Sequence, residues 1–260
     1  MAQLPKEAQS QLEGAELANS SKYPFNQFTN IFSVLLTKGK LKYDDYLLIR
    51  DAYFRRNPYL DLFEKAPRTF GQTWGETWLR EQKKLLQRPP RREGYKPQFD
   101  LWLQMENGNG IKIEVKSSRV VESDPQRTLV ERAYKRPHGT EEEIKQKMET
   151  ELSFKMNFQQ LKPKYCDVFI WIAVWLDDID IWVIPSEKIK MRPKNAKCRN
   201  PKGSIVCEDG TIYMGVQHAG GKGGDTPEGE IFISNKHFYD LKRYKATLDN
   251  LVEKIISHCH

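Results

Sequence analysis

The sequence predicts a mixed α/β domain, in which helices flank a central mixed β-sheet and the N-terminal part is helical. Three observations predict this fold class. Apolar residues recur every three or four positions within residues 23–86 and every two positions through residues 99–116, and an unbroken apolar run fills residues 168–175. Helices and strands bury side chains with periods of 3.6 and 2, so we expect helices first and sheet strands after them.

The N-terminal part is expected to be a loose arm followed by helices. Residues 1–20 are polar and rich in Gln, Ala and Ser, which is typical of such an arm. The spacing of apolar residues predicts helices at residues 25–35, 43–53, 59–65 and 69–86. Asn57-Pro58 separates the second from the third, and Trp74 and Trp78 are apolar anchors of the last.

A β-hairpin is the clearest local prediction. Apolar residues alternate with polar ones on both sides of a turn: Phe99, Leu101, Leu103 and Met105 before it, and Ile111, Ile113 and Val115 after it. The turn itself is Asn107-Gly108-Asn109-Gly110. Tight hairpin turns need positive φ angles, which Asn and Gly adopt readily, so residues 99–116 are expected to pair as two antiparallel strands.

The second half of the chain is expected to mix strands, loops and helices. Thr140 and Glu143 form the sequence pattern of a capping box, which predicts a helix over residues 140–161. Residues 168–175 are apolar enough for a strand buried on both faces, and a further strand at 179–184 ends at Pro185. The remaining expectations are loops at 121–139, 188–204 and 218–230, short strands around Asp209-Gly210 and at 231–233, and a helix at 235–256.

The charge of the chain is compatible with nucleic-acid binding. The net charge is +7, and the excess is concentrated in two stretches. Residues 80–96 hold seven Lys/Arg and two Glu, and residues 187–202 hold seven Lys/Arg and one Glu. Two separated basic stretches suit a surface that follows a phosphate backbone, and two solvated surface segments are the alternative.

Several classes of protein are not expected. No apolar run is long enough to cross a bilayer, and the first 20 residues lack the pattern of a secretory signal. The four cysteines are too few and too scattered for a disulfide framework or a paired zinc motif: Cys166, Cys198, Cys207 and Cys259. A reducing cytoplasm fits this cysteine usage.

The hairpin is predicted to gather two carboxylates and one lysine. Glu114 and Lys116 are two residues apart on a strand and therefore share a face, and Asp100 lies on the preceding strand about 5 Å away. Metal-assisted phosphodiester hydrolysis needs clustered carboxylates and a nearby cation. Three other acid-x-Lys patterns fall in predicted helices: 81–83, 143–145 and 240–242. An amphipathic hairpin with a solvated polar face is the alternative.

Asp100 followed by Glu114-Val115-Lys116 resembles the signature of the PD-(D/E)xK nuclease superfamily, which includes type II restriction endonucleases. The resemblance covers residues 70–185 and implies a restriction-endonuclease-like core. Phe99 stands where the family has a proline, with Pro97 three residues before Asp100.

The resemblance implies a role for each matching residue. Asp100, Glu114 and the Val115 carbonyl would hold Mg²⁺, a cation that prefers hard oxygen ligands. Lys116 would orient or deprotonate the attacking water, or stabilise charge on the phosphate. Many members add a carboxylate from the helix before the hairpin. Glu76 is the candidate here, with an ordinary surface glutamate as the alternative and Glu81 as the fallback.

DNA contacts are predicted at residues around this core. Ser117, Ser118 and Arg119 directly follow the motif and suit contacts to phosphates or bases, with ordinary strand-end residues as the alternative. Further contacts are predicted at Arg91, Arg92, Lys194, His218 and Lys222. Gln159 and Gln160 resemble a helix-borne Gln found in some members, with solvated positions as the alternative. The glycine-rich stretch matches no nucleotide-binding motif, so no nucleotide cofactor is expected.

The sequence therefore favours a Mg²⁺-dependent type II restriction endonuclease of bacterial or archaeal cytoplasm. It would act on double-stranded DNA as a homodimer, with the N-terminal helices as the dimer surface. The expected layout is an arm at 1–20 and one nuclease domain at 21–260, divided into a helical subregion at 21–68, a catalytic core at 69–185, and recognition loops with a C-terminal helix at 186–260. A repair, recombination or phage nuclease, and a DNA-binding protein without catalysis, are the alternatives.

Overall fold

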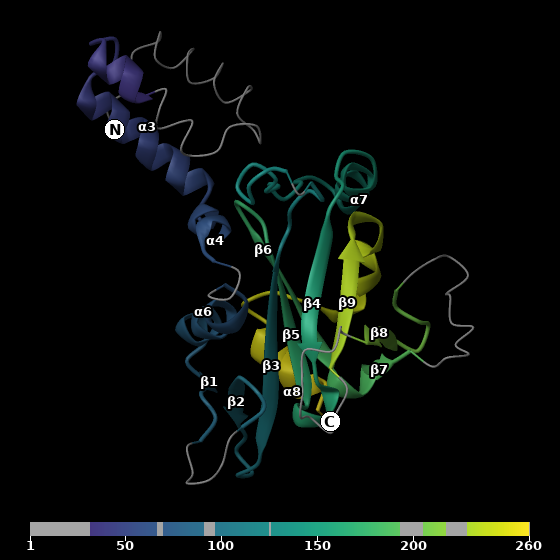
Figure 1. Ribbon diagram of the computed structural model, residues 1–260. Helices are drawn as coiled ribbons and strands as arrows, with labels where there is room; N and C mark the ends of the chain where they lie inside the picture. Colours follow the sequence, from purple (N-terminus) through teal and green to yellow (C-terminus); the bar gives the residue numbers. More distant parts are fainter. Residues whose placement is uncertain are drawn as a thin grey trace.

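Six strands form the central sheet of the computed structural model, which describes residues 32–66, 70–90, 97–124, 126–192, 205–216 and 228–259. Their order across the sheet is β1 (Leu86–Gln87), β2 (Leu101–Gln104), β3 (Gly110–Arg119), β5 (Val168–Val174), β6 (Ile179–Pro185) and β10 (Lys245–Ala246). The β3–β5 pair is parallel and the other pairs are antiparallel. A mixed α/β fold with helices beside a mixed sheet is thus confirmed (Figure 1).

The predicted hairpin is present as β2 and β3. Leu101 pairs with Ile113 and Leu103 with Ile111, in antiparallel register. Gly108 has φ 82°, which confirms a turn that depends on positive φ. A side chain on Gly110 would overlap the Trp102 ring, because a Cβ there would lie 1.8 Å from Trp102 Cζ2.

Helices cover one face of the central sheet. This face is lined by alternate residues of the strands, and it packs against α4 (Leu60–Glu64), the π-helical turn η1 (Phe70–Trp74), α6 (Gly75–Gln82) and α8 (Leu251–Ser257). The helix α3 (Tyr43–Arg56), preceded by helical residues 32–37, extends away from this body (Figure 1). The helix expected over 69–86 ends at Gln82, because Leu86 already belongs to β1.

A second sheet covers the other face. It consists of β4 (Lys155–Leu161), β9 (Gly229–Ser234), β8 (Ile212–Val216) and β7 (Ile189–Met191), in that order. Phe158 of β4 stacks on Trp171 of β5 with ring centroids 4.7 Å apart, so aromatic side chains fill the space between the sheets. Figure 1 shows β4 and β9 lying over the central strands.

Two predicted helices were too long. Thr140 caps α7 (Glu141–Thr150) with the expected capping box, but the helix ends at Thr150 and the chain continues as β4. Met156 and Phe158 alternate with more exposed residues, which is the strand period within a stretch predicted as helix. The helix expected over 235–256 is instead a 3-10 helix η4 (Asn235–Tyr244), the strand β10 and α8.

The remaining local predictions are confirmed in part. The strands expected at 168–175, 179–184 and 231–233 are β5, β6 and β9. Around Asp209-Gly210, Val206 bridges Ile212 and β8 follows. Short 3-10 turns at Pro163–Tyr165 (η2) and Ser186–Lys188 (η3) join the strands. The arm at 1–20, the helix at 25–31 and most of both expected loops at 188–204 and 218–230 lie outside the described residues.

Within the described ranges, every helix is too short or too polar to cross a lipid bilayer.

Candidate active site

The hairpin places the Asp100 carboxylate beside the middle of β3. Asp100 immediately precedes β2, and its backbone N–H donates to the Ile113 carbonyl at 3.0 Å. Its Oδ2 accepts a hydrogen bond from the Val115 backbone N–H at 2.8 Å. The backbone of Asp100 therefore continues the antiparallel pairing of the hairpin. Its carboxylate lies against Val115, the residue between Glu114 and Lys116.

Glu114 and Lys116 form an ion pair on the same face of β3. Lys116 Nζ lies 2.6 Å from Glu114 Oε1, and both side chains are largely buried. The register pairs Glu114 with Phe169 and Lys116 with Trp171, which line the space between the two sheets. Glu114 and Lys116 are thus not on a solvated surface, in contrast to the amphipathic-hairpin alternative, although Lys112 at the start of the same face is exposed.

Burial makes negative charge costly at this site. Burial raises the pKa of Asp100, while the Val115 N–H and the Lys116 ammonium lower it. Burial also raises the pKa of Glu114 to about 7; Lys116 lowers this pKa and the Asp100 carboxylate raises it. Two carboxylates that resist ionisation together provide a place where a bound cation would be favourable.

The donor set fits a divalent cation with hard oxygen ligands. Asp100 and Glu114 supply carboxylates, and their mutual repulsion would be relieved by positive charge. Among the described residues, no group of three or more His, Cys, Asp or Glu side chains is close enough to hold a metal ion. The remaining ligands would then be the backbone carbonyl of Val115, water and phosphate oxygens, which is the pattern that Mg²⁺ commonly adopts.

Comparison with protein-family models, with curated proteins and with solved structures finds no match for this chain. The likeness to the PD-(D/E)xK signature is therefore one of sequence pattern and hairpin geometry.

Glu76 lies close to this site without joining a three-carboxylate cluster. A Cβ on Gly75 would lie 2.3 Å from Ser117 Oγ and 3.1 Å from Val115 Cγ1, so α6 packs directly on β3. The pKa of the half-buried Glu76 is raised by burial and then by the Asp100 carboxylate, and lowered by Arg88 and Arg80. Glu81, the fallback, is exposed on the same helix.

The residues after the motif have partners inside the chain. Ser118 is buried, and its Oγ accepts a hydrogen bond from the Asn157 backbone N–H at 3.2 Å. Arg119 is also buried, and its guanidinium donates to the carbonyls of Leu62 and Lys65, each at 2.7 Å. This placement speaks against DNA contacts by Ser118 and Arg119: the hydroxyl joins the two sheets, and the guanidinium ties α4 to β3.

Ser117 differs from its two neighbours because it faces α6, where its hydroxyl lies under Gly75. Gln159 and Gln160 lie on β4, so the comparison with a helix-borne Gln was wrong. The five other predicted DNA contacts lie outside the described residues: Arg91, Arg92, Lys194, His218 and Lys222.

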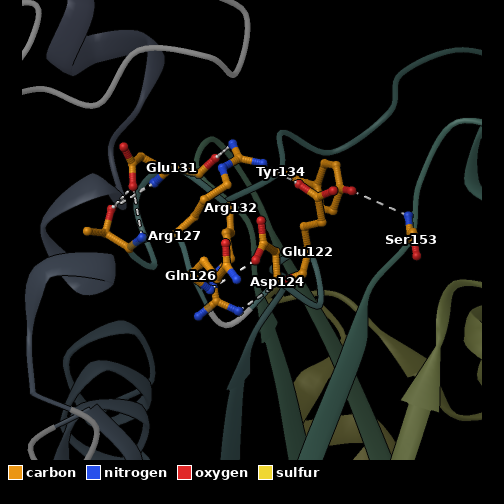
Figure 2. Close-up of polar contacts among 9 residues, drawn as sticks. Glu122, Asp124, Gln126, Arg127, Glu131, Arg132, Tyr134 and Ser153 are labelled. Carbon is orange, nitrogen blue, oxygen red and sulfur yellow. Dashed lines mark hydrogen bonds and ion pairs between the residues drawn. The ribbon is translucent and has the colours of Figure 1, made fainter.

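The charged segment after β3 is ordered by its own polar contacts (Figure 2). Arg127 pairs with Glu122 at 2.7 Å, and Glu131 accepts hydrogen bonds from the backbone and hydroxyl of Thr128. The Tyr134 hydroxyl accepts a hydrogen bond from the Ser153 backbone N–H at 3.4 Å, just before β4. These contacts hold the end of β3 beside the start of β4.

Lys162 is a cation of the site that the sequence patterns did not indicate. It directly follows β4, and its charge lowers the pKa of Glu114. The residue falls in a stretch that was predicted as the end of a helix and its loop, so its place beside the hairpin depends on long-range strand pairing.

Proposed function

We propose that this chain is a Mg²⁺-dependent endonuclease that hydrolyses double-stranded DNA, in the manner of a type II restriction enzyme. The observation that carries the proposal is the grouping of Asp100, Glu114 and Lys116 on one hairpin, with the lysine 2.6 Å from the glutamate. A buried carboxylate beside a partly buried carboxylate and a partly buried ammonium is costly to maintain for stability alone, and such perturbed groups are concentrated at functional sites.

Each residue has a defined part in phosphodiester hydrolysis. Asp100 and Glu114 would hold the cation, which when bound polarises the phosphate and lowers the pKa of water. Lys116, kept in place by Glu114, would orient the attacking water and donate to a phosphate oxygen as negative charge develops there. Water attacks phosphorus and the bond to the 3′ oxygen breaks, leaving 5′-phosphate and 3′-hydroxyl ends.

The test is cleavage of unmethylated phage DNA with Mg²⁺ or with EDTA. We expect Asp100→Asn, Glu114→Gln and Lys116→Ala each to lose about 100-fold or more of the activity, because each removes a group that acts on the transition state. Lys112→Ala is the matched control: Lys112 is exposed on the same strand, two residues before Glu114, and its loss should leave cleavage unchanged.

The pattern of products decides between the candidate functions. Discrete fragments that need Mg²⁺ and all three residues support a sequence-specific endonuclease. A smear with the same dependence points to a repair or recombination nuclease. DNA binding without cleavage under any divalent cation would reject catalysis and leave a DNA-binding protein.

Metal binding is measured separately from activity. Mg²⁺ should raise the melting temperature of the wild-type protein, because it binds the folded site, and Asp100→Asn should remove this shift. An equal shift in both proteins would show that Mg²⁺ binds elsewhere.

A further inference from the structure

The strand β4 runs antiparallel to β3 in the neighbouring sheet, so its last residues lie toward the end of β3 that carries Glu114. Phe154 bridges Glu122 in antiparallel fashion, and the Asn157 N–H donates to Ser118 Oγ at 3.2 Å. Both contacts lie at one end of the two strands. From these contacts β3 runs back to Glu114, and β4 runs on through a bulge to Leu161. Lys162 is the next residue.

A β-bulge sets which side chains stand at that end of β4. The pairing of β4 with β9 shifts between Phe158 and Leu161, and Gln160 has φ 56°. A side-chain-bearing residue with positive φ costs free energy and is held only by its surroundings. The inserted residue lets Leu161 be fully buried where strict alternation would bury Gln160, so the strand ends with Lys162 next to an apolar anchor.

Lys162 is held by an acidic partner from the second sheet. Its Nζ lies 2.7 Å from Glu228 Oε1, and both side chains are a little over a quarter exposed. Glu228 directly precedes β9, whose first residue, Gly229, pairs with Leu161. A Cβ on Gly229 would lie 2.0 Å from Met214 Sδ, so close packing on β8 fixes the backbone beside Glu228.

We propose that Lys162 binds a backbone phosphate of the DNA next to the one that is cleaved, and that Glu228 holds the lysine until that phosphate replaces it. The inference rests on the proposed function. A partly exposed ion pair is weak, so exchange of one anionic partner for another costs little. The second sheet thereby supplies a positive group to a site whose carboxylates come from the hairpin.

The experiment measures DNA binding without cleavage, by fluorescence anisotropy of a short duplex in EDTA over a range of salt concentrations. Lys162→Ala should weaken binding several-fold and lower the salt-dependence slope by about 0.9, as expected for the loss of one phosphate contact. Lys162→Arg should restore most of the binding. Glu228→Gln should tighten binding, because the lysine is then free.

Two further variants make the test specific. Lys155→Ala removes an exposed lysine from the opposite end of β4 and should leave the slope unchanged. In the double variant Lys162→Ala with Glu228→Gln, affinity should equal that of Lys162→Ala alone, because Glu228 acts through the lysine. Thermal unfolding of each variant checks that the fold is intact.

Contrary results separate this inference from the proposed function. An unchanged slope in a folded Lys162→Ala protein that still binds DNA overturns the role of Lys162 and leaves the nuclease proposal standing. A Glu228→Gln effect that persists without Lys162 overturns the exchange of partners. A wild-type protein that neither binds DNA in EDTA nor cleaves it with Mg²⁺ overturns both proposals.

Discussion

At the scale of single residues, the site combines burial with charge in a way that opposes stability. Glu114 has a pKa of about 7, raised mainly by burial from an ordinary value of 4.5. In the metal-free protein its protonated form is favoured by folding. The stabilisation is complete below the ordinary pKa and is lost as pH rises through about 7.

The free energy of unfolding should show this dependence. Without divalent cations, the wild type should lose about 3 kcal/mol between pH 4.5 and 7 relative to Glu114→Gln, whose side chain stays neutral. Urea unfolding of both proteins across this range measures the difference, in which the titration of groups that do not interact with Glu114 cancels. A difference that does not change with pH would mean that Glu114 ionises as it does in water.

Arg119 shows the reverse case, a charged residue with a structural task. Its guanidinium donates to two carbonyls near the end of α4 and lies 4.1 Å from the centroid of the Phe70 ring. Burial lowers its pKa to about 10, so the side chain stays charged at neutral pH. The residue therefore connects the N-terminal helices to the strand that carries the site.

Replacing Arg119 should destabilise the fold and leave the salt dependence of the proposed DNA binding unchanged. We expect Arg119→Met to lower the free energy of unfolding by about 2–3 kcal/mol, because the carbonyls of Leu62 and Lys65 lose a charged donor. Arg55→Ala, at an exposed position of α3, is the control and should change stability little. If Arg119→Met lowered the salt dependence of DNA binding, Arg119 would contact DNA despite its burial.

At the scale of elements, sequence patterns predicted those turns, caps and strands that are stabilised by residues close in the sequence. The Asn-Gly turn, the capping box at Thr140 and the apolar run of β5 each depend on neighbouring residues, and all three are present. The strand β4 was missed because its stability comes from β9, more than seventy residues later in the chain. Helical and strand periods compete in such a stretch, and tertiary pairing decides between them.

The candidate site follows the same division. The hairpin trio was found because turn and alternation fix its register. The surroundings of the trio were not predicted, because Ser118 and Arg119 are buried by contacts with β4 and α4, which are distant in the sequence. Lys162 lies near enough to lower the pKa of Glu114 only because the second sheet packs on the first, and the spacing of residues within the motif carries no information on that packing.

The capping box offers a test of a purely local element. Thr140→Ala should lower the free energy of unfolding by about 1 kcal/mol, because the Glu143 N–H loses its acceptor. Glu142→Ala, in the same exposed first turn, should lower the free energy of unfolding by only a few tenths of a kcal/mol, because it removes one favourable interaction with the helix dipole. Equal effects of the two substitutions in urea denaturation would show that charge near the helix start, and not the reciprocal hydrogen bonds, stabilises α7.

At the scale of the whole molecule, one chain provides one hairpin site, whereas a DNA duplex has two strands. Under the proposed function, cutting both strands in one encounter requires two such sites, and a twofold dimer would provide them in the symmetry of a palindromic target. The helix α3 extends from the body in Figure 1 and exposes Tyr43, Leu48 and Phe54 on its surface. Tyr43 and Phe54 are eleven residues apart and therefore lie on one side of α3, whereas Leu48 lies on another side. The side that exposes Tyr43 and Phe54 suits an isologous contact with a second copy.

The proposed dimer contact through α3 predicts whether the first product from a supercoiled plasmid is linear or nicked. The wild type should sediment as a dimer and convert the plasmid directly to linear DNA. Phe54→Glu should sediment as a monomer and accumulate nicked plasmid, because each encounter then delivers one site. Asp44→Asn, exposed on the same helix, should behave as the wild type. A Phe54→Glu protein that still sediments as a dimer and linearises the plasmid directly would place the dimer contact elsewhere.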